Sequence, residues 1–343
     1  MGTIWFWLTA IMLVFYVVLD GFDIGVGAIH MIAGRTSAER EQGIRAIGPV
    51  WDGNEVWLLA GGGTLFFAFP ALYAAGFSGF YLPLMIVLWL LVLRGVSVEL
   101  RMHIGLNVWQ DFFDGVFNLS SALLAVFLGA ALANVIRGVP LGADGYFFAP
   151  LWTNWRMGPY PGILDWYTVI GGVLALVALS VHGAFYLAMK TEGEVQRRAR
   201  KTASVLLPLL VLLTVVGLLA TMHVQPLVLQ NYMHYKVAML VPVAVLVALM
   251  MMFVYASCKK DAQAFLSSST FLAVMLAGAV IGLYPVLLPS TLGPQYNITI
   301  ENSLSGHHGL VVGLVWWGIG MVMASVYFTI VYRMFRGKVQ GTA

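Results

Sequence analysis

Acidic side chains inside long apolar stretches are the residues of this chain that could do chemistry. Asp20 and Asp23 lie in the first stretch, and their spacing of three residues places both on one helical face. Asp52 and Glu55 have the same spacing at the start of the second stretch, with Asn54 between them. A charge inside a membrane span costs about 2.5–3.5 kcal/mol, so each one needs a partner, a water-filled cavity or a function. Carboxylates that bind and release protons in turn can relay them, and this set predicts a proton pathway.

A basic residue accompanies these acids in the third apolar stretch. Arg94 lies about one turn from Glu99 and at a depth where it can reach Asp20 or Asp23. A structural ion pair of Arg94 with Glu99, or with one of the aspartates, is therefore expected. Capping of a helix N-terminus explains one carboxylate of the second stretch but not acids on several stretches at one depth.

The histidines give weaker indications of a functional site than the acidic residues do. His182 is alone in the fifth apolar stretch, where a histidine usually makes a hydrogen bond between helices. As a haem ligand it is the weakest of the candidate site residues. Haem-binding helices carry paired histidines at matching depths, whereas the other histidines fall near the ends of stretches or in connections. No haem and no metal site are predicted on this chain. His307 and His308 stand side by side in an outer connection, which we interpret as a plain loop.

The elements that position these residues are transmembrane helices. Apolar residues make up 60% of the 343 residues and charged residues only 10%, which excludes a soluble enzyme. The net charge of +3, without a basic stripe, argues against a nucleic-acid partner. Nine stretches are long enough to cross a bilayer. They lie near 4–30, 54–72, 79–102, 114–136, 163–188, 203–222, 236–257, 268–288 and 309–333.

Basic residues in the connections predict the orientation, because cytoplasmic loops are enriched in Lys and Arg. The odd-numbered connections and the C-terminal tail carry most of them, whereas the even-numbered connections hold only Arg137 and Arg156. The N-terminus is thus predicted outside and the C-terminus in the cytoplasm. The sequence indicates an all-α integral membrane protein, a single membrane domain over 1–343 built of packed helix bundles.

Two long motifs resemble subunit II of the cytochrome bd family of quinol-oxidising terminal oxidases. They are Leu19-Asp20-Gly21-Phe22-Asp23-Ile24-Gly25-Val26-Gly27 and Gly48-Pro49-Val50-Trp51-Asp52-Gly53-Asn54-Glu55-Val56-Trp57-Leu58. The resemblance continues through Arg94-Gly95-Val96 and Gly183-Ala184-Phe185-Tyr186-Leu187, and it covers nearly the whole chain.

The resemblance implies a supporting role in a quinol:oxygen oxidoreductase that is electrogenic without pumping protons. Haem b and haem d are then carried by subunit I, the partner of this chain in the bacterial inner membrane, and no catalytic residue lies on this chain. The family's proton-pathway acid corresponds to Asp52, and Asp20, Asp23 and Arg94 match its other polar positions. A structural isoprenoid quinone and small single-helix accessory subunits are further partners of the family.

Two other functions fit buried acids in a membrane. A proton-coupled secondary transporter needs them as well, but such transporters commonly show inverted repeats and broken helices, and neither is evident in this sequence. A self-sufficient cytochrome b would need histidine pairs. Both alternatives predict a different result for a haem spectrum taken with and without the partner.

Overall fold

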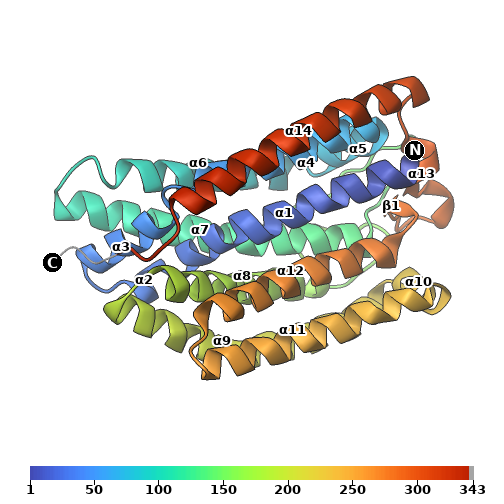
Figure 1. The fold of residues 1–343 in the computed structure, drawn as a ribbon. Helices are drawn as coiled ribbons and strands as arrows, with labels where there is room; N and C mark the ends of the chain where they lie inside the picture. The colour runs from blue at the N-terminus through green and yellow to red at the C-terminus, as the bar shows by residue number, and fades with distance from the viewer. Residues whose placement is uncertain (340–343) are drawn as a thin grey trace.

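Long helices that run side by side make up nearly all of the structure (Figure 1). The structure is a computed structural model and describes residues 1–339. Its first half contains α1 (Gly2–Ala28), α2 (His30–Ala33), α3 (Ser37–Ile47), α4 (Trp51–Ala68), α5 (Pro70–Gly79), α6 (Tyr81–Leu100) and α7 (Asn107–Arg137). Its second half contains α8 (Trp166–Lys190), α9 (Gly193–Val224), α10 (Pro226–His234), η1 (Lys236–Met239), α11 (Leu240–Ser257), α12 (Asp261–Leu283), β1 (Val286–Leu288), η2 (Pro294–Tyr296), β2 (Ile298–Thr299), α13 (Ile300–Ser303) and α14 (His307–Met334).

Eight helical stretches in residues 1–339 are long and apolar enough to cross a membrane. They are α1, α6, α7, α8, α9, η1 together with α11, α12 and α14. The predicted second span, 54–72, falls on α4, which is not one of the eight because its first turns carry Asp52, Asn54 and Glu55. The helix ends at Ala68, and Pro70 begins α5.

The predicted eighth span, 268–288, is too long at its C-terminal end. Helix α12 ends at Leu283, and Val286–Leu288 forms β1, which pairs antiparallel with β2. Pro285 lacks a backbone N–H and cannot continue the helical hydrogen-bond ladder. The all-α prediction therefore holds for the membrane region but not for this two-stranded connection.

Helix α1 lies at the centre of the bundle and packs against α4, α7, α8 and α12. Glycines make the contact with α8 close: a Cβ atom on Gly25 would lie 1.9 Å from the carbonyl oxygen of Leu179. Gly183 on α8 faces the backbone of Gly25 in the same way. The polar end of α1 is thereby enclosed by neighbouring helices instead of facing lipid.

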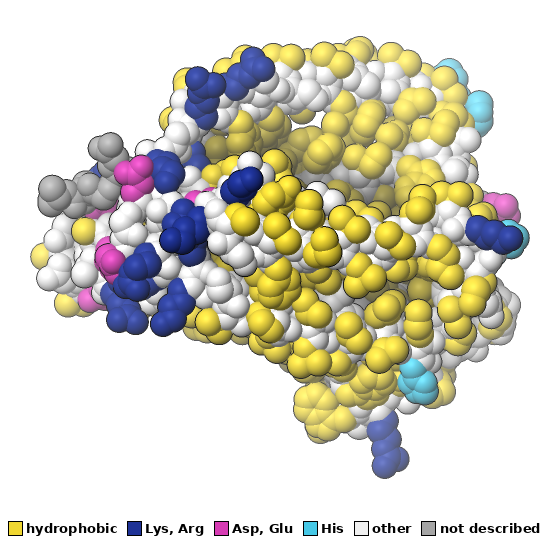
Figure 2. Space-filling view, turned by 60° about the horizontal axis from the view of Figure 1, so that its bottom comes forward, with side chains coloured by type: hydrophobic (Ala, Val, Ile, Leu, Met, Phe, Trp, Pro, Cys, Tyr) yellow, Lys and Arg dark blue, Asp and Glu magenta, His cyan; other side chains and the backbone are white. Residues whose placement is uncertain are grey.

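Helix α14 lies along one edge of the bundle and ends at the opposite end from the start of α1 (Figure 1). Only Leu310 of α14 is buried. Hydrophobic side chains cover most of the face drawn in Figure 2, and Lys and Arg gather mainly at the end where the chain terminates. This distribution is that of a lipid-facing protein with one strongly basic end.

Candidate functional site

An arginine connects two acids from different helices near the basic end of the bundle. Arg94 on α6 donates through Nη1 to Asp20 Oδ1 of α1 at 2.7 Å and through Nη2 to Glu55 Oε2 of α4 at 3.1 Å. The side chains of Arg94 and Asp20 are buried, whereas that of Glu55 is 25% exposed. The ion pair thus links three helices and leads from the interior toward the surface.

The expected pairing of Arg94 with Glu99 needs correction, because the pairs of Arg94 within residues 1–339 are those with Asp20 and Glu55. Glu99 is exposed. Residues five apart on a helix point in clearly different directions, so Glu99 cannot share the buried face of α6 with Arg94.

Asp23 has a separate partner. The amide Nδ2 of Asn54 donates to Asp23 Oδ2 at 2.7 Å and to the carbonyl oxygen of Leu19 at 3.3 Å. The hydroxyl of Tyr332 on α14 donates to Asn54 Oδ1 at 2.8 Å. A chain of hydrogen bonds therefore runs from the last helix through Asn54 to the second buried aspartate.

Several polar atoms of this cluster have no hydrogen-bond partner among the residues that the structure describes. They are Tyr16 Oη, Asp20 Oδ2, Asp23 Oδ1 and Arg94 Nε. Buried polar groups are normally hydrogen-bonded. The two carboxylate oxygens can each accept a proton or a water molecule, whereas Tyr16 Oη and Arg94 Nε can donate to water. We use the term acid cluster for Asp20, Asp23, Asn54, Glu55 and Arg94.

Asp52 lies at the edge of the acid cluster and not within it. It is exposed in the first turn of α4, three residues before Glu55 and on the same helical side. Its side chain does not cap the helix, since Val50 occupies the N-cap position without a side-chain hydrogen bond. Its place in the first turn is nonetheless one where the helix dipole favours a negative charge, as the sequence analysis expected.

A second buried network, which the sequence analysis missed, surrounds Asp114 on α7. Its carboxylate accepts from Arg101 Nε at 2.5 Å, from Arg40 Nη1 at 3.0 Å and contacts His30 Nε2 at 2.7 Å. The predicted fourth span, 114–136, begins at this residue, and a charge at the end of a span costs little. The spacing of Asp111 and Asp114 close after Arg101 is the signal that could have indicated it.

Helix α3 is tied to this end of the bundle by Glu39. Burial opposes its charge, but Arg198 and the backbone amides of Arg35 and Thr36 donate to the carboxylate and lower the pKa of Glu39 to about 2. Thr36 and Glu39 also form a capping box at the start of α3.

His182 serves as an interhelical connector. Its Nε2 lies 3.0 Å from the carbonyl oxygen of Val18 on α1, and its Nδ1 lies 2.7 Å from Ser268 Oγ on α12. Its ring stacks on Phe265 with centroids 4.8 Å apart. Both ring nitrogens are engaged, which leaves neither free for a metal.

His307 and His308 are exposed in the first turn of α14. Within residues 1–339 no group of three or more His, Cys, Asp and Glu side chains is arranged to hold a metal ion. The pair therefore lacks the additional ligands that a protein metal site requires.

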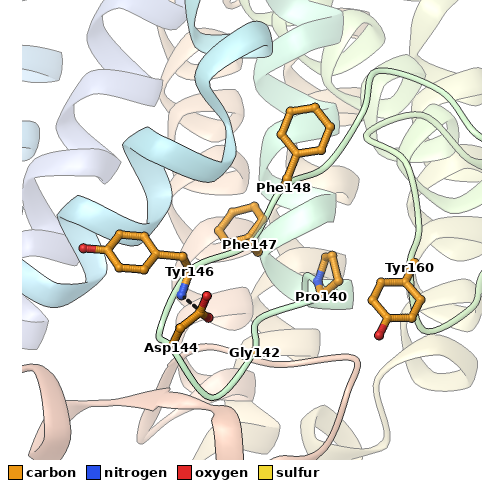
Figure 3. Close-up of a pocket in the computed structure, with 7 residues that line it drawn as sticks. All are labelled: Pro140, Gly142, Asp144, Tyr146, Phe147, Phe148 and Tyr160. Atoms are coloured by element: carbon orange, nitrogen blue, oxygen red, sulfur yellow. Dashed lines mark hydrogen bonds between the residues drawn. The ribbon is translucent and has the colours of Figure 1, made fainter.

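The connection between α7 and α8 contains a pocket of about 540 Å³ (Figure 3). Its lining residues are Pro140, Gly142, Asp144, Tyr146, Phe147, Phe148 and Tyr160. The buried pair of Arg137 and Asp165 fixes the two ends of this connection. None of the predicted site residues lines the pocket, so it belongs to a different part of the molecule from the acid cluster.

Comparison with known proteins agrees with the sequence motifs. A family described as cytochrome bd terminal oxidase subunit II matches residues 1–335. Cytochrome bd ubiquinol oxidase subunit 2 of Bacillus subtilis (strain 168) is 33% identical, over 90% of this chain and 88% of that protein. Cytochrome bd-I ubiquinol oxidase subunit 2 of Escherichia coli (strain K12) is 30% identical, over 95% and 91% of the two chains.

A solved structure shares the fold. A chain of the bd oxidase from Geobacillus thermodenitrificans superposes with a TM-score of 0.78 at 16% identity, covering 97% of this chain and 98% of that chain. The arrangement of helices in Figure 1 is thus one that occurs in a membrane oxidase.

Proposed function

Because the chain belongs to the cytochrome bd terminal oxidase subunit II family, we propose that its buried acids conduct protons toward the oxygen-reducing site of the complex. The complex is a quinol:oxygen oxidoreductase of the respiratory chain, and this chain is a multi-pass subunit of the bacterial inner membrane. Because the chain belongs to this family, an oxidase subunit is favoured over the alternative of a proton-coupled secondary transporter.

The observation that carries the proposal is the excess of acids around one arginine. Asp20, Asp23 and Glu55 surround Arg94, so the acid cluster is electrically neutral only when it holds two protons. A net charge is expensive in a low-dielectric interior. A cluster that must hold exchangeable protons can pass them on, because carboxylates alternate between the two forms.

Asp52 is the proposed point of proton uptake. It is exposed at the basic end, and Glu55 follows it by about one turn with a partly exposed side chain. The order Asp52, Glu55, Arg94, Asp20 therefore leads from the surface to the interior. The family resemblance assigns the same role to Asp52 on independent grounds.

We propose that subunit I covers the face formed by α4, α6 and α14. Val56 and Leu59 continue the exposed side of α4 beyond Asp52, and most residues of α14 are exposed, with Leu310 alone buried. A carboxylate beside such an apolar face would be costly next to lipid. A protein partner there would receive the protons and shield the route from lipid.

Further details of the complex follow from the same membership. We propose nine membrane crossings, α4 with α5 adding one to the eight, with the N-terminus outside and the C-terminus in the cytoplasm. Haem b and haem d would lie on subunit I and none on this chain. A structural isoprenoid quinone and small single-helix subunits are additional partners in this proposal.

The test is Asp52→Asn in the complete complex with subunit I. We expect oxygen consumption with quinol to slow at least about tenfold, since a positioned proton-transfer group typically contributes about 10²–10⁴-fold. The reduced-minus-oxidised haem spectrum should stay unchanged. Glu99→Gln is the matched control, because it neutralises an exposed acid that lies outside the acid cluster. Wild-type turnover in Asp52→Asn would refute the route through this residue.

A further inference from the structure

The last helix reaches the acid cluster through a single phenol group. Helix α14 contributes only Leu310 to the buried interior, yet its Tyr332 hydroxyl donates to Asn54 Oδ1 at 2.8 Å. Asn54 is fully buried. Phe328, one turn earlier, packs on Trp57 of α4 with ring centroids 5.4 Å apart. This part of α14 is therefore seated directly over the start of α4.

The hydrogen-bonding groups around Asn54 determine which way its amide points. Nδ2 faces two acceptors, Asp23 Oδ2 and the carbonyl oxygen of Leu19, so the nitrogen must lie on that side. Oδ1 then faces Tyr332, which is the donor. If the amide turned over, its oxygen would face two acceptors, and that arrangement is repulsive.

We infer that Tyr332 is a positioning residue for proton transfer, which acts by holding Asn54 in the orientation that donates to Asp23. The inference rests on the proposed function of the acid cluster and extends it to α14. Asp23 Oδ1 has no partner within residues 1–339, so Asn54 is the donor that supports the ionised form of this acid. Tyr332 thereby couples the seating of the last helix to the protonation of Asp23.

Other groups near Asp23 also affect its protonation equilibrium. The titratable and charged side chains that face it come from α1, α4, α6, α8 and α14, and they are Asp20, Glu55, Arg94, Tyr186 and Tyr332. Among them, Tyr332 is the one hydrogen-bonded to the amide of Asn54 in the described part of the chain. Its removal changes the donor to Asp23 and leaves the ion pair of Arg94 in place.

The experiment is Tyr332→Phe in the complete complex, with oxygen consumption measured as a function of pH. Tyr332→Phe leaves Asn54 Oδ1 without its donor, so Asn54 is no longer held to donate to Asp23, and loss of that hydrogen bond to a charged carboxylate corresponds to a displacement of about one pH unit. We expect the pH profile of turnover to move by that amount while haem content stays normal. Tyr327→Phe is the matched control: Tyr327 lies on the same helix, is 54% exposed, and should leave the profile in place.

A double variant separates positioning from a general effect on packing. In an Asn54→Ala background the link to Asp23 is already broken, so Tyr332→Phe should add no further displacement of the profile. A second displacement of equal size, or the same displacement in Tyr327→Phe, would overturn the inference. So would an unchanged profile in Tyr332→Phe.

The two proposals fail in different ways. An unchanged Tyr332→Phe profile beside a slow Asp52→Asn enzyme refutes the positioning role and leaves the proton route standing. A displaced Tyr332→Phe profile beside a normal Asp52→Asn rate supports the link to Asp23 and refutes uptake through Asp52.

Discussion

Replacing Asp114 by Asn should destabilise the protein strongly. The change keeps the shape of the side chain but removes the negative charge that Arg101, Arg40 and His30 share. Arg101 and Asp114 both have fully buried side chains. Breaking a buried ion pair by removing one partner costs about 3–5 kcal/mol, because the remaining charge stays desolvated. The expected loss in thermal midpoint is roughly 5–10 °C.

Asp111→Asn is the matched control for this prediction. Asp111 lies on the same helix and also binds Arg40, at 2.7 Å, but its side chain is 63% exposed. An exposed pair contributes about 0–1 kcal/mol. Thermal unfolding of the purified complex in detergent, followed by the loss of monodisperse protein, compares the two variants under one condition. Equal midpoints would show that Arg101 reaches water and that burial of the pair does not matter.

Three further changes test the packing and the electrostatics. Arg94→Ala should lower the yield of assembled complex through a loss of several kcal/mol, because Asp20 loses its buried partner; normal yield and melting would argue against the ion pair. Gly25→Leu should prevent folding, since even a Cβ atom would overlap Leu179, and wild-type expression would mean that α1 and α8 are less close than described. Glu39→Gln should cost stability at neutral pH, because the folded pKa of Glu39, about 2, lies below the ordinary value of 4.5. The difference in stability from wild type should be full above pH 4.5 and vanish as the pH falls toward 2. A difference that grows in acid would contradict this.

Hydropathy predicts most of the fold because a bilayer imposes helices of a fixed length on apolar sequence. It does not show how polar side chains are accommodated in such a helix, as in α4, since their cost is met by partners on other helices that no local window contains. It also cannot show where α14 lies, because a uniformly apolar helix has no polar side to orient it.

Some residues of the candidate site can be predicted from the sequence and others cannot. Asp20, Asp23 and Arg94 are recognisable because charges are rare in such sequence. Tyr332 is not recognisable, because tyrosines near the ends of membrane helices usually serve as interfacial anchors. Only the position of α14 against α4 reveals its hydrogen bond to Asn54.

The acid cluster and the network around Asp114 differ in their balance of positive and negative charges. Around Asp114, two arginines and a histidine face one buried carboxylate and its exposed neighbour Asp111. Every charge there has a partner, so a change of protonation would break favourable contacts. In the acid cluster, by contrast, Asp20 and Glu55 share Arg94 while Asp23 is bound only by the neutral amide of Asn54, and protons must supply the missing positive charge. Such a site gains or loses a proton without breaking the ion pair that holds its helices together. The surplus of acids, and not burial as such, is therefore the feature on which we propose the acid cluster, and not the network around Asp114, as the proton pathway.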